Sequence, residues 1–517
     1  MKIGYFFKSC PMSVIVISVL LAACATDNTI APDRPIQIET GLISGIAGVD
    51  QAVTVFKGIP FAAPPVGDLR WRAPQPPQAW KGVRKADEYC KSCIQALTRK
   101  YMPWTEEYMI GNEVDEDCLG LNVWTAAKTN EEKRPVLVYI HGGAYTGGSG
   151  EVLLYNGESL AKKGIVVVTV NYRVDIMGFF THPELTKESP NNSSGNYGLL
   201  DHIAALKWVK QNISAFGGDP DNVTISGQSA GAASIHYLTA SPLAKGLFHK
   251  AIAQSGPWSK NRSGLNLEEG EKKGIAFATE WDKQSLKELR VMDALDLLEK
   301  SSQDFGNRFL PIVDGWVLPK SVTEQYADGD QNDVPMLMGL NADERSSNAT
   351  YGKISAEDFI ANARNRYGEK ADEYLTMYPA STDTVAGESQ KQSFRDSGLA
   401  NMGVWADFRS QTGSSKDFLY FFDRITPWPE FPQYGAFHSS EMPYVFNNQH
   451  LIDRPWESVD ADLAEIMSSY WVNFITSGNP NGEGLPEWSS EKGRMMRLDE
   501  DPNMDVILSE EKMEFYQ

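Results

Sequence analysis

The chain is short of positive charge. Its 517 residues include 48 lysines and arginines against 68 aspartates and glutamates, so the formal net charge is −20. Proteins that bind nucleic acid hold its phosphates with clusters of Lys and Arg, and this sequence has no such cluster. We therefore exclude nucleic acid as a partner. The hydrophobic share of 42% excludes a largely disordered chain.

The N-terminal apolar run is short as well. Residues 12–21 are apolar but too few to span a bilayer as a helix. Lys2 and Lys8 precede the run, and the residues that follow it include small side chains, which together are typical of an export signal. We expect residues 1–23 to be this signal, so the remaining chain has a charge of −22 after losing two lysines and no acidic residue.

The end of the signal can be interpreted in two ways. Residues 21–24 read Leu-Ala-Ala-Cys and resemble a bacterial lipobox, in which Cys24 becomes the lipidated first residue. Residues 23–25 read Ala-Cys-Ala and also fit an ordinary cleavage site. The first predicts a lipid anchor at Cys24 in the bacterial envelope as the only membrane attachment. The second predicts a periplasmic or secreted protein. Residues 24–34 then form a tether.

Cysteine is scarce. Of five cysteines, Cys10 is lost with the signal and Cys24 lies at its end, which leaves Cys90, Cys93 and Cys118 in an oxidising compartment. One disulfide and one free thiol is the simplest outcome. Cys90 and Cys93 form C-x-x-C, but no second cysteine pair or cluster of histidines follows, so we expect no zinc and no other metal or cofactor.

The remaining chain lacks linkers, charge blocks and repeats, and strand-like and helix-like segments alternate along it. Early strands are expected at 36–46 and 53–59. Helical spacing occurs at 199–216 and ends at Gly217. Continuous apolar runs predict buried strands at 135–140, 165–172, 222–226, 249–254, 334–339 and 418–422. This order predicts an α/β fold with a mostly parallel sheet between helices. Residues 257–332 and 345–415 are expected to be helical insertions that cap the sheet.

One pentapeptide indicates the chemistry. Residues 227–231 read Gly-Gln-Ser-Ala-Gly and match G-x-S-x-G. The motif alone is a weak signal, but here it follows the strand at 222–226 and precedes a helix expected to start near Ala232. A serine on such a tight strand-to-helix turn is an exposed nucleophile, and Ser229 is the candidate.

A serine nucleophile also needs hydrogen-bond donors for the oxyanion that forms on the attacked carbonyl. One donor is the N–H of the residue after the nucleophile, here Ala230. The others come from a loop after an earlier strand. Residues 141–144 (His-Gly-Gly-Ala) stand directly after the strand at 135–140, so the N–H groups of Gly143 and Ala144 complete the set.

These motifs and several others resemble those of the type-B carboxylesterases, the α/β-hydrolase family that includes the cholinesterases. The match runs over the whole chain after the signal. It includes 56–61 (Phe-Lys-Gly-Ile-Pro-Phe), 116–119 (Glu-Asp-Cys-Leu), 195–201 (Gly-Asn-Tyr-Gly-Leu-Leu-Asp) and 478–482 (Gly-Asn-Pro-Asn-Gly). The sequence is similar to the bacterial exported members of the para-nitrobenzyl esterase-like kind. The resemblance implies that residues 35–517 form one α/β-hydrolase domain, with large helical insertions that form a gorge over the site.

The resemblance also implies the partners of Ser229. The family places its catalytic acid in G-x-N-x-D-E, which matches 339–344 and assigns Glu344. Its histidine lies in G-x-x-H-x-x-E, which matches 435–441 and assigns His438. Asp343 is the alternative acid, and otherwise a solvated loop carboxylate. The other six histidines are expected to be structural or exposed.

Further residues follow from the same resemblance. Ser255 is expected to support the acid. Gln228 stands where most members have Glu, which weakens the case for a choline-like cation as substrate. Arg345 follows the acid where Gly is usual, and either alters the surroundings of the acid or points to solvent. Trp104 and its aromatic neighbours are expected to rim the gorge or simply to pack.

The family disulfide ends at the Cys118 position. Cys93 fits its other half better than Cys90, which would then be free. Two structural ion pairs are also implied by the resemblance, Arg70 with Glu116 and Arg173 with Asp201.

The predicted function is hydrolysis of a small carboxylic ester through an acyl-enzyme on Ser229. A non-catalytic cell-surface binding protein of the same fold is the alternative from another class. Its known examples lose the nucleophile or the histidine, which this chain keeps. A lipase and an amidase or carbamate hydrolase are alternatives within the enzymes. The oligomeric state is not predicted.

Overall fold

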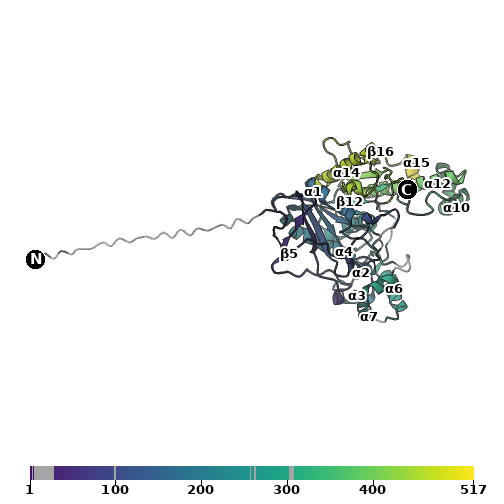
Figure 1. Cartoon of the computed structure of the whole chain (residues 1–517). Coiled ribbons are helices and arrows are strands. Elements are labelled where there is room, and N and C mark those ends of the chain that lie inside the picture. Colours follow the sequence, from purple (N-terminus) through teal and green to yellow (C-terminus); the bar gives the residue numbers. More distant parts are fainter. Residues whose placement is uncertain are drawn as a thin grey trace.

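The computed structural model describes residues 1–2, 4, 28–97, 101–256, 258–260, 264–283, 285–301 and 308–517. Its centre is a mixed sheet of eleven strands (Figure 1). In spatial order these are β16 (Asn503–Val506), β15 (Arg494–Leu498), β14 (Asp417–Phe422), β13 (Met336–Asn341), β12 (Lys250–Gln254), β11 (Gly218–Gln228), β9 (Arg134–Ile140), β10 (Val166–Val170), β8 (Gly120–Thr125), β4 (Thr54–Pro60) and β3 (Ile46–Ala47).

The seven strands from β10 to β15 run parallel, and the strands at both edges pair antiparallel. The register aligns their carboxyl ends: Ile140 pairs with Gly227, Gln228 with Gln254, and Gln254 with Gly339. The central strands are buried on both faces, as their continuous apolar sequences predict. Loops that follow these strands therefore meet at one edge of the sheet.

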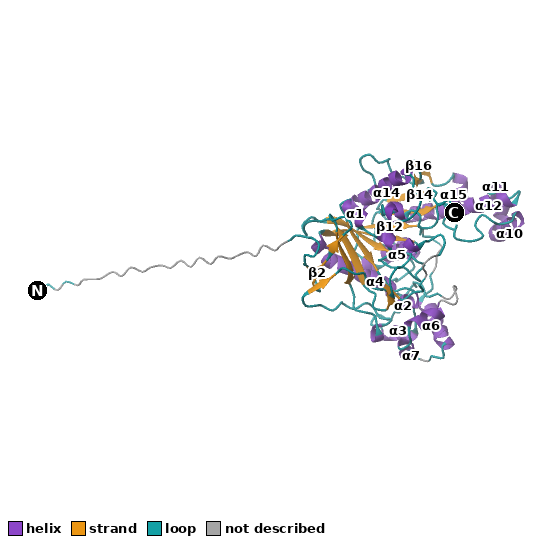
Figure 2. Ribbon diagram, in the orientation of Figure 1, coloured by secondary structure: helices purple, strands orange, loops and turns teal. Residues whose placement is uncertain are grey.

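Helices cover both faces of the sheet (Figure 2). Helices α1 (Glu158–Lys162) and α14 (Ser458–Ser477) pack against β8, β9, β10 and β11, and α4 (Tyr197–Asn212) and α5 (Ala230–Ala240) pack against β11 and β12. Helix α4 begins two residues before the predicted segment 199–216, and the segment ends in a 3-10 turn and then at Gly217 with φ of 78°. A left-handed residue of this kind is the usual stop of a helix.

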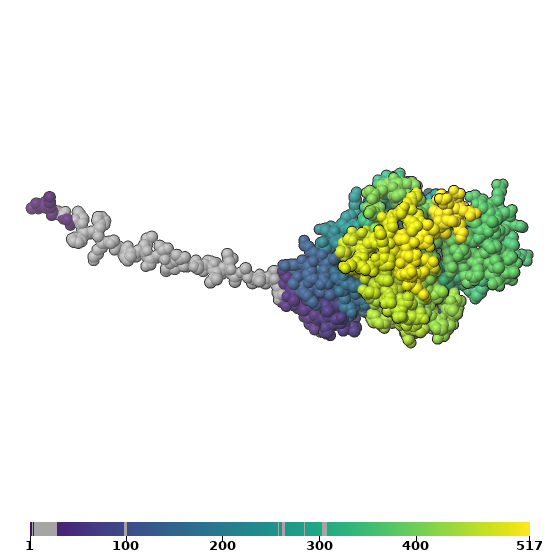
Figure 3. Space-filling view, turned by 90° about the horizontal axis from the view of Figure 1, so that it is seen from above, coloured from purple at the N-terminus to yellow at the C-terminus, as the bar shows by residue number. Residues whose placement is uncertain are grey.

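The two insertions are helical, as predicted. The first contains α6 (Leu267–Glu280), α7 (Leu286–Arg290), α8 (Ala294–Ser301) and α9 (Val322–Ala327). The second contains α10 (Ala356–Tyr367), α11 (Ala371–Met377) and α12 (Asp383–Arg409). Residues of the second insertion form a lobe at one end of the molecule, coloured green in Figure 3.

Some strands differ from the prediction. The segment 36–46 is not one strand: β1 (Ile36–Ile38) and β2 (Gly41–Ser44) form a small separate sheet with β5 (Val83–Lys85), and the chain then enters β3. Strands β8, β15 and β16 were not predicted. Strand β8 is buried throughout but includes Asn122, and β15 begins and nearly ends with Arg, so neither is a continuous apolar run.

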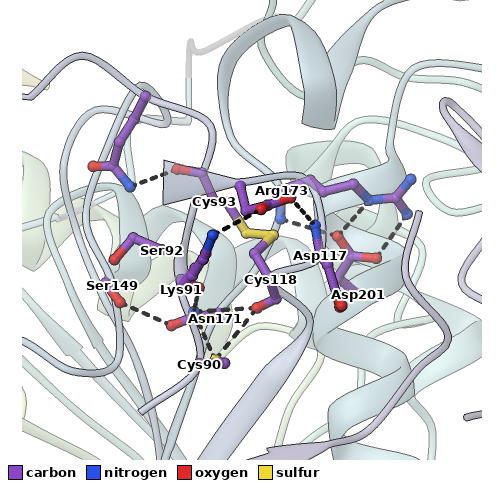
Figure 4. The surroundings of a disulfide bond; sticks show 12 residues. Cys90, Lys91, Ser92, Cys93, Asp117, Cys118, Ser149, Asn171, Arg173 and Asp201 are labelled. Carbon is purple, nitrogen blue, oxygen red and sulfur yellow. Dashed lines mark hydrogen bonds and ion pairs between the residues drawn. A yellow bond between two sulfur atoms is a disulfide. The ribbon is translucent and has the colours of Figure 1, made fainter. Parts of the chain in front are cut away.

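A disulfide joins Cys93 and Cys118, the pair that the resemblance implies, and Cys90 is free (Figure 4). Asn171 binds this region together, because its side-chain amide donates to the carbonyl oxygen of Cys118 at 3.1 Å and to Sγ of Cys90 at 3.3 Å. Burial raises the pKa of Cys90 to about 12. Cys90 is thus protonated at neutral pH.

Both implied ion pairs are present. The Arg70 guanidinium donates to Glu116 at 2.7 Å, and Arg173 donates to the two oxygens of Asp201 at 2.7 and 2.8 Å (Figure 4). Arg173 and Asp201 are both buried, so each compensates the charge of the other.

Part of the predicted tether, residues 24–34, is already packed against the fold. Ile30 is only 3% exposed, and its N–H donates to the carbonyl oxygen of Lys128 at 2.8 Å. The residues of the predicted signal from 5 to 23, and Cys24 itself, lie outside the described residues. Among the helices that are described, none is long and apolar enough to cross a membrane.

The disulfide gives a stability prediction. Cys93 and Cys118 are 25 residues apart, and cross-linking a loop of this length stabilises the fold by about 3.5 kcal/mol in the chain-entropy model. We expect C93A/C118A to lose roughly this free energy of unfolding, measured by urea denaturation. The C90A variant, which keeps the cross-link, is the control and should lose only about 1 kcal/mol. Equal losses in the two variants would contradict the assignment.

Candidate active site

Ser229 occupies a strained turn between β11 and α5. Its φ of 60° and ψ of −119° are rare for a residue with a side chain and cost roughly 1–3 kcal/mol. The two flanking glycines make the turn possible. A Cβ on Gly231 would lie 2.2 Å from the Ile140 carbonyl oxygen, and one on Gly227 would lie 2.5 Å from the carbonyl carbon of Gly231. Helix α5 begins at Ala230, two residues earlier than predicted, so Ser229 is its N-cap residue.

The loop of residues 141–144 follows β9 and packs against this turn. A Cβ on Gly142 would lie 2.7 Å from the Gln228 carbonyl oxygen, so only glycine fits there. Gly143 and Ala144 are exposed, with φ of 108° and 55°. In the part of the chain that the structure describes, the N–H groups of Gly143, Ala144 and Ala230 donate no hydrogen bond. They are therefore available to an external acceptor.

His141 supports this loop. Its Nδ1 lies 2.8 Å from the Gly142 carbonyl oxygen, and its ring stacks on Tyr172 at 4.3 Å. Burial lowers the pKa of His141 to about 4 and that of His202 to about 3. Both rings are consequently neutral at pH 7, as expected of structural histidines.

Glu344 and His438 come together from two loops at the same edge of the sheet. Glu344 follows β13, and the N–H of Asn341 donates to its Oε1 at 2.8 Å. His438 lies in the segment between β14 and α13 (Met442–Val445), and its Nδ1 contacts Oε2 of Glu344. The two loops are joined by a short parallel bridge between Asp343 and Phe437. The three residues that the resemblance assigns thus lie on three loops at the carboxyl ends of neighbouring strands.

The environment keeps Glu344 ionised. Burial raises the pKa of a carboxylic acid, but His438, the Asn341 N–H and the Ser255 hydroxyl act against it, and the pKa of Glu344 is lowered. Burial likewise lowers the pKa of His438, but the adjacent Glu344 carboxylate outweighs it and the pKa of His438 is raised. The pair therefore favours imidazolium beside carboxylate.

The other nitrogen of His438 faces Gln228. The Gln228 side-chain amide nitrogen lies 3.1 Å from Nε2 of His438. In the neutral form of His438, Nδ1 faces the Glu344 carboxylate and carries the single ring proton, so Nε2 accepts from the amide. The described contacts include no hydrogen bond between Ser229 and His438. Sequence reasoning placed Gln228 near the site but gave no indication of this contact.

Asp343 is neither the acid nor the solvated carboxylate that we expected as its alternative. It is only 7% exposed, and its oxygens accept from Tyr351 at 2.8 Å, from Arg395 at 2.7 Å and from the Ala436 N–H at 3.0 Å. It therefore joins the acid loop to the histidine loop and to α12. The reason for the wrong expectation is that its partners are remote in sequence.

Two further side chains contact the site. The indole N–H of Trp104 donates to the His438 carbonyl oxygen at 3.0 Å, which fits the predicted aromatic rim. Glu441 is fully buried and accepts from the Asn341 amide at 2.6 Å and from Gln254 at 3.3 Å. Sequence reasoning assigned no role to Glu441, although it closes the G-x-x-H-x-x-E motif.

Comparison with known proteins identifies the family. The model of the carboxylesterase family matches residues 32–516. A fumonisin B1 esterase from Sphingopyxis macrogoltabida is 35% identical over 92% of this chain and 88% of its own. A para-nitrobenzyl esterase from Bacillus subtilis (strain 168) is 36% identical over 90% of this chain and 95% of its own. A solved structure of a PNB esterase superposes with a TM-score of 0.79 at 32% identity, and covers 94% of this chain and 99% of that chain.

The chain belongs to the carboxylesterase family and has the α/β-hydrolase fold, as its sequence predicts. It is a serine carboxylic ester hydrolase.

Glu441 makes the stability depend on pH. Burial, and then the charge of Glu344, raise its pKa from 4.5 to about 7, so between these values the folded chain holds a proton that the unfolded chain releases. Stability that depends on this proton is lost as the pH rises through that window. Glu441→Gln removes the titration, so its free energy of unfolding relative to the wild type should rise by roughly 2 kcal/mol from pH 4.5 to 7 and then level off.

Urea unfolding of both proteins at several pH values measures this difference. The new amide adds a constant offset, because its NH₂ faces other donors, but that offset does not vary with pH. A difference that is flat from pH 4.5 to 8 would show that Glu441 is ionised throughout.

Proposed function

We propose that the chain hydrolyses small carboxylic esters with Ser229 as nucleophile, His438 as base and Glu344 as the acid that orients it. The observation that carries this proposal is the contact between His438 and Glu344 beside the strained Ser229 turn. The relatives are all named as esterases, but their names refer to different ester compounds: fumonisin B1, para-nitrobenzyl and cocaine esters. We therefore expect ester hydrolysis to be common to these relatives, whereas the ester that is hydrolysed differs from one chain to another.

In the proposed reaction, Nε2 of His438 takes the proton of the Ser229 hydroxyl as the oxygen attacks the ester carbonyl. The imidazolium is stabilised by the Glu344 carboxylate, which keeps its charge. The tetrahedral intermediate collapses when His438 returns the proton to the leaving alcohol. The acyl group then remains on Ser229, and a water molecule activated by His438 releases it as the acid.

The developing oxyanion would bind to the N–H groups of Gly143, Ala144 and Ala230. They are suited to this role because two belong to an exposed loop and the third to the first turn of α5, where the helix dipole favours negative charge. Each such donor typically contributes roughly 3 kcal/mol of transition-state stabilisation.

Gln228 must move for this reaction. Its amide occupies Nε2 of His438, which is the atom that the Ser229 hydroxyl needs. When the Gln228 side chain rotates away, the Ser229 hydroxyl replaces its amide as the donor to the lone pair of Nε2. The ring of His438 therefore keeps a hydrogen-bond partner. We therefore place Gln228 as the resting-state partner of the base.

We also propose the division of the chain into an export signal at 1–23, a connecting segment at 24–34 whose residue Ile30 already packs into the fold, and one hydrolase domain at 35–517. The main core, with residues from Ile36 to Ile507, supports the single domain, and a second, smaller cluster lies in the second insertion and includes Phe359 and Tyr374. The disulfide between Cys93 and Cys118 fits an oxidising compartment, and lipidation of Cys24 remains part of this proposal.

Removal of the nucleophile tests the mechanism. Ser229→Ala should lower kcat for 4-nitrophenyl butyrate by about 10⁴-fold or more, because the base and acid act only through that hydroxyl. Its urea unfolding curve should match the wild type. Turnover within tenfold of the wild type, or a retained burst of 4-nitrophenol, would refute Ser229 as the nucleophile.

Substitution of Gln228 tests the assignment of the base. Gln228→Glu brings a second carboxylate close to Nε2 of His438, which stabilises the imidazolium and raises the pKa of His438 further. Because the neutral ring is the base, the acidic limb of the kcat/KM–pH profile should move up by about 1 pH unit or more. Gln228→Ala adds no charge and is the control; it removes only a donor to the neutral ring, so its limb should move up much less than that of Gln228→Glu. An unchanged limb in Gln228→Glu would exclude His438 as the titrating base.

A further inference from the structure

The disulfide closes a segment at 93–118, whose described residues are here called the disulfide segment. Near its start, the buried side chain of Gln95 donates to the Gly148 carbonyl oxygen at 2.8 Å and accepts from the Gly148 N–H at 2.7 Å. Gly148 follows a turn in which the Gly147 N–H donates to the Gly143 carbonyl oxygen at 3.2 Å. The disulfide segment is therefore fastened to the proposed oxyanion loop.

The middle of the disulfide segment contacts the loop that carries the proposed base. The indole N–H of Trp104 donates to the His438 carbonyl oxygen at 3.0 Å and to Oγ of Ser439 at 3.3 Å. The Trp104 and His438 rings meet edge to face, with 6.2 Å between their centres. The Tyr108 ring adds a second contact, because it packs against Phe437 at 6.0 Å. One segment thus reaches both the oxyanion loop and the base.

The backbone at His438 depends on this indole. Ser439 has a φ of 79°, a left-handed conformation that is uncommon for a residue with a side chain. The peptide that joins His438 to Ser439 is thus held in a strained turn. Among the described residues, no donor other than Trp104 reaches the His438 carbonyl oxygen. Loss of the indole N–H would therefore release this peptide, and the imidazole would shift with it.

Trp104 is itself held in place. Its backbone N–H donates to the Tyr101 carbonyl oxygen at 2.8 Å, and its carbonyl oxygen accepts from the Tyr101 N–H at 3.1 Å. The Tyr101 ring stacks on the indole with 5.8 Å between the ring centres. The disulfide between Cys93 and Cys118 joins the two ends of the segment. A donor that is fixed in this way can hold the backbone of a neighbouring loop.

We propose that Trp104 is a positioning residue for the base: the disulfide segment acts through its indole on the His438 carbonyl oxygen and so sets the place of the imidazole beside Glu344. This inference rests on the proposed triad and adds a support to it. In this role Trp104 acts through the backbone of His438 and transfers no proton itself. Its effect should therefore appear in the chemical steps and not in substrate binding.

Trp104→Phe tests the proposal on the full chain, because phenylalanine keeps an aromatic ring and lacks the N–H. It should lower kcat for 4-nitrophenyl butyrate by about tenfold, since a small displacement of a reacting group is costly, and leave KM within about twofold. Trp80→Phe is the matched control. Trp80 is also partly buried, and its indole N–H donates to the Leu42 carbonyl oxygen at 2.7 Å in the small separate sheet. This control should change neither constant.

Stability does not account for such a difference. Each variant loses the hydrogen bond from an indole to a backbone carbonyl, so the urea unfolding curves of Trp104→Phe and Trp80→Phe should shift alike. Equal kcat values for the two variants, or a loss that is confined to KM, would refute the positioning role of Trp104.

The disulfide provides a second comparison. C93A/C118A should lower kcat in the wild-type background, measured at a temperature at which urea unfolding shows every variant to be folded. In the Trp104→Phe background the same change should lower kcat by a smaller factor, because the link through the indole is already lost. Equal factors in the two backgrounds would show that the disulfide segment does not act on the base through Trp104.

A titration without substrate separates this inference from the proposed function. In protein labelled with ¹³C-histidine, the Cε1–H signal of His438 is identified by its absence in His438→Gln, and its pH dependence gives the pKa of the imidazole. Glu344 raises this pKa in the wild type. Trp104→Phe should return the pKa of His438 toward its ordinary value, because the imidazole shifts away from the carboxylate, and Trp80→Phe should leave it unchanged.

The two hypotheses can then fail separately. If Ser229→Ala still hydrolyses the ester while the pKa of His438 falls only in Trp104→Phe, the proposed function fails and the positioning of His438 stands. If Ser229→Ala is inactive while the pKa of His438 and kcat are the same in Trp104→Phe and Trp80→Phe, the triad stands and the positioning role of Trp104 fails.

Discussion

The turn at Ser229 is the constraint on which the rest of the site depends. A residue with a side chain is held at a positive φ at the point where β11, which pairs in register with β9 on one side and β12 on the other, passes directly into α5. The close approach of Gly231 to the Ile140 carbonyl ties α5 to the end of β9. The same approach brings residues 141–144 against the nucleophile. One strained residue thereby sets the position of the proposed nucleophile, the proposed oxyanion loop and the helix N-terminus together.

The protonation of His438 depends on the charges of two nearby carboxylates, those of Glu344 and Glu441. Glu344 is next to His438 and is held ionised, whereas Glu441 is more deeply buried and holds its proton up to about pH 7. Asn341 contacts both, with its backbone N–H on Glu344 and its amide on Glu441. One negative charge beside the base stabilises imidazolium, while a second would hold His438 protonated and inactive as a base. In the proposed mechanism, the burial of Glu441 thus keeps His438 able to act as a base.

The parts that the sequence predicts well are local. The central strands are continuous apolar runs, and Ser229 lies in a motif whose strand and helix are adjacent in the chain. Glu344 and His438 have no such local signal, and only the family resemblance assigns them. The contact of Gln228 with His438 joins residues 210 positions apart, and Asp343 meets Arg395 52 positions away. Such contacts depend on how the loops pack in space, and the sequence on either side of each residue does not indicate them.

The reaction is easier to infer than the substrate, because the groups assigned to the reaction and the walls around the site come from different parts of the fold. The reacting groups stand on short loops at the ends of β9, β11, β13 and β14, which the sheet holds in fixed register. A cavity of about 260 Å³ beside Glu344 is walled by α10 and α12 of the second insertion, whose sequence the sheet does not constrain.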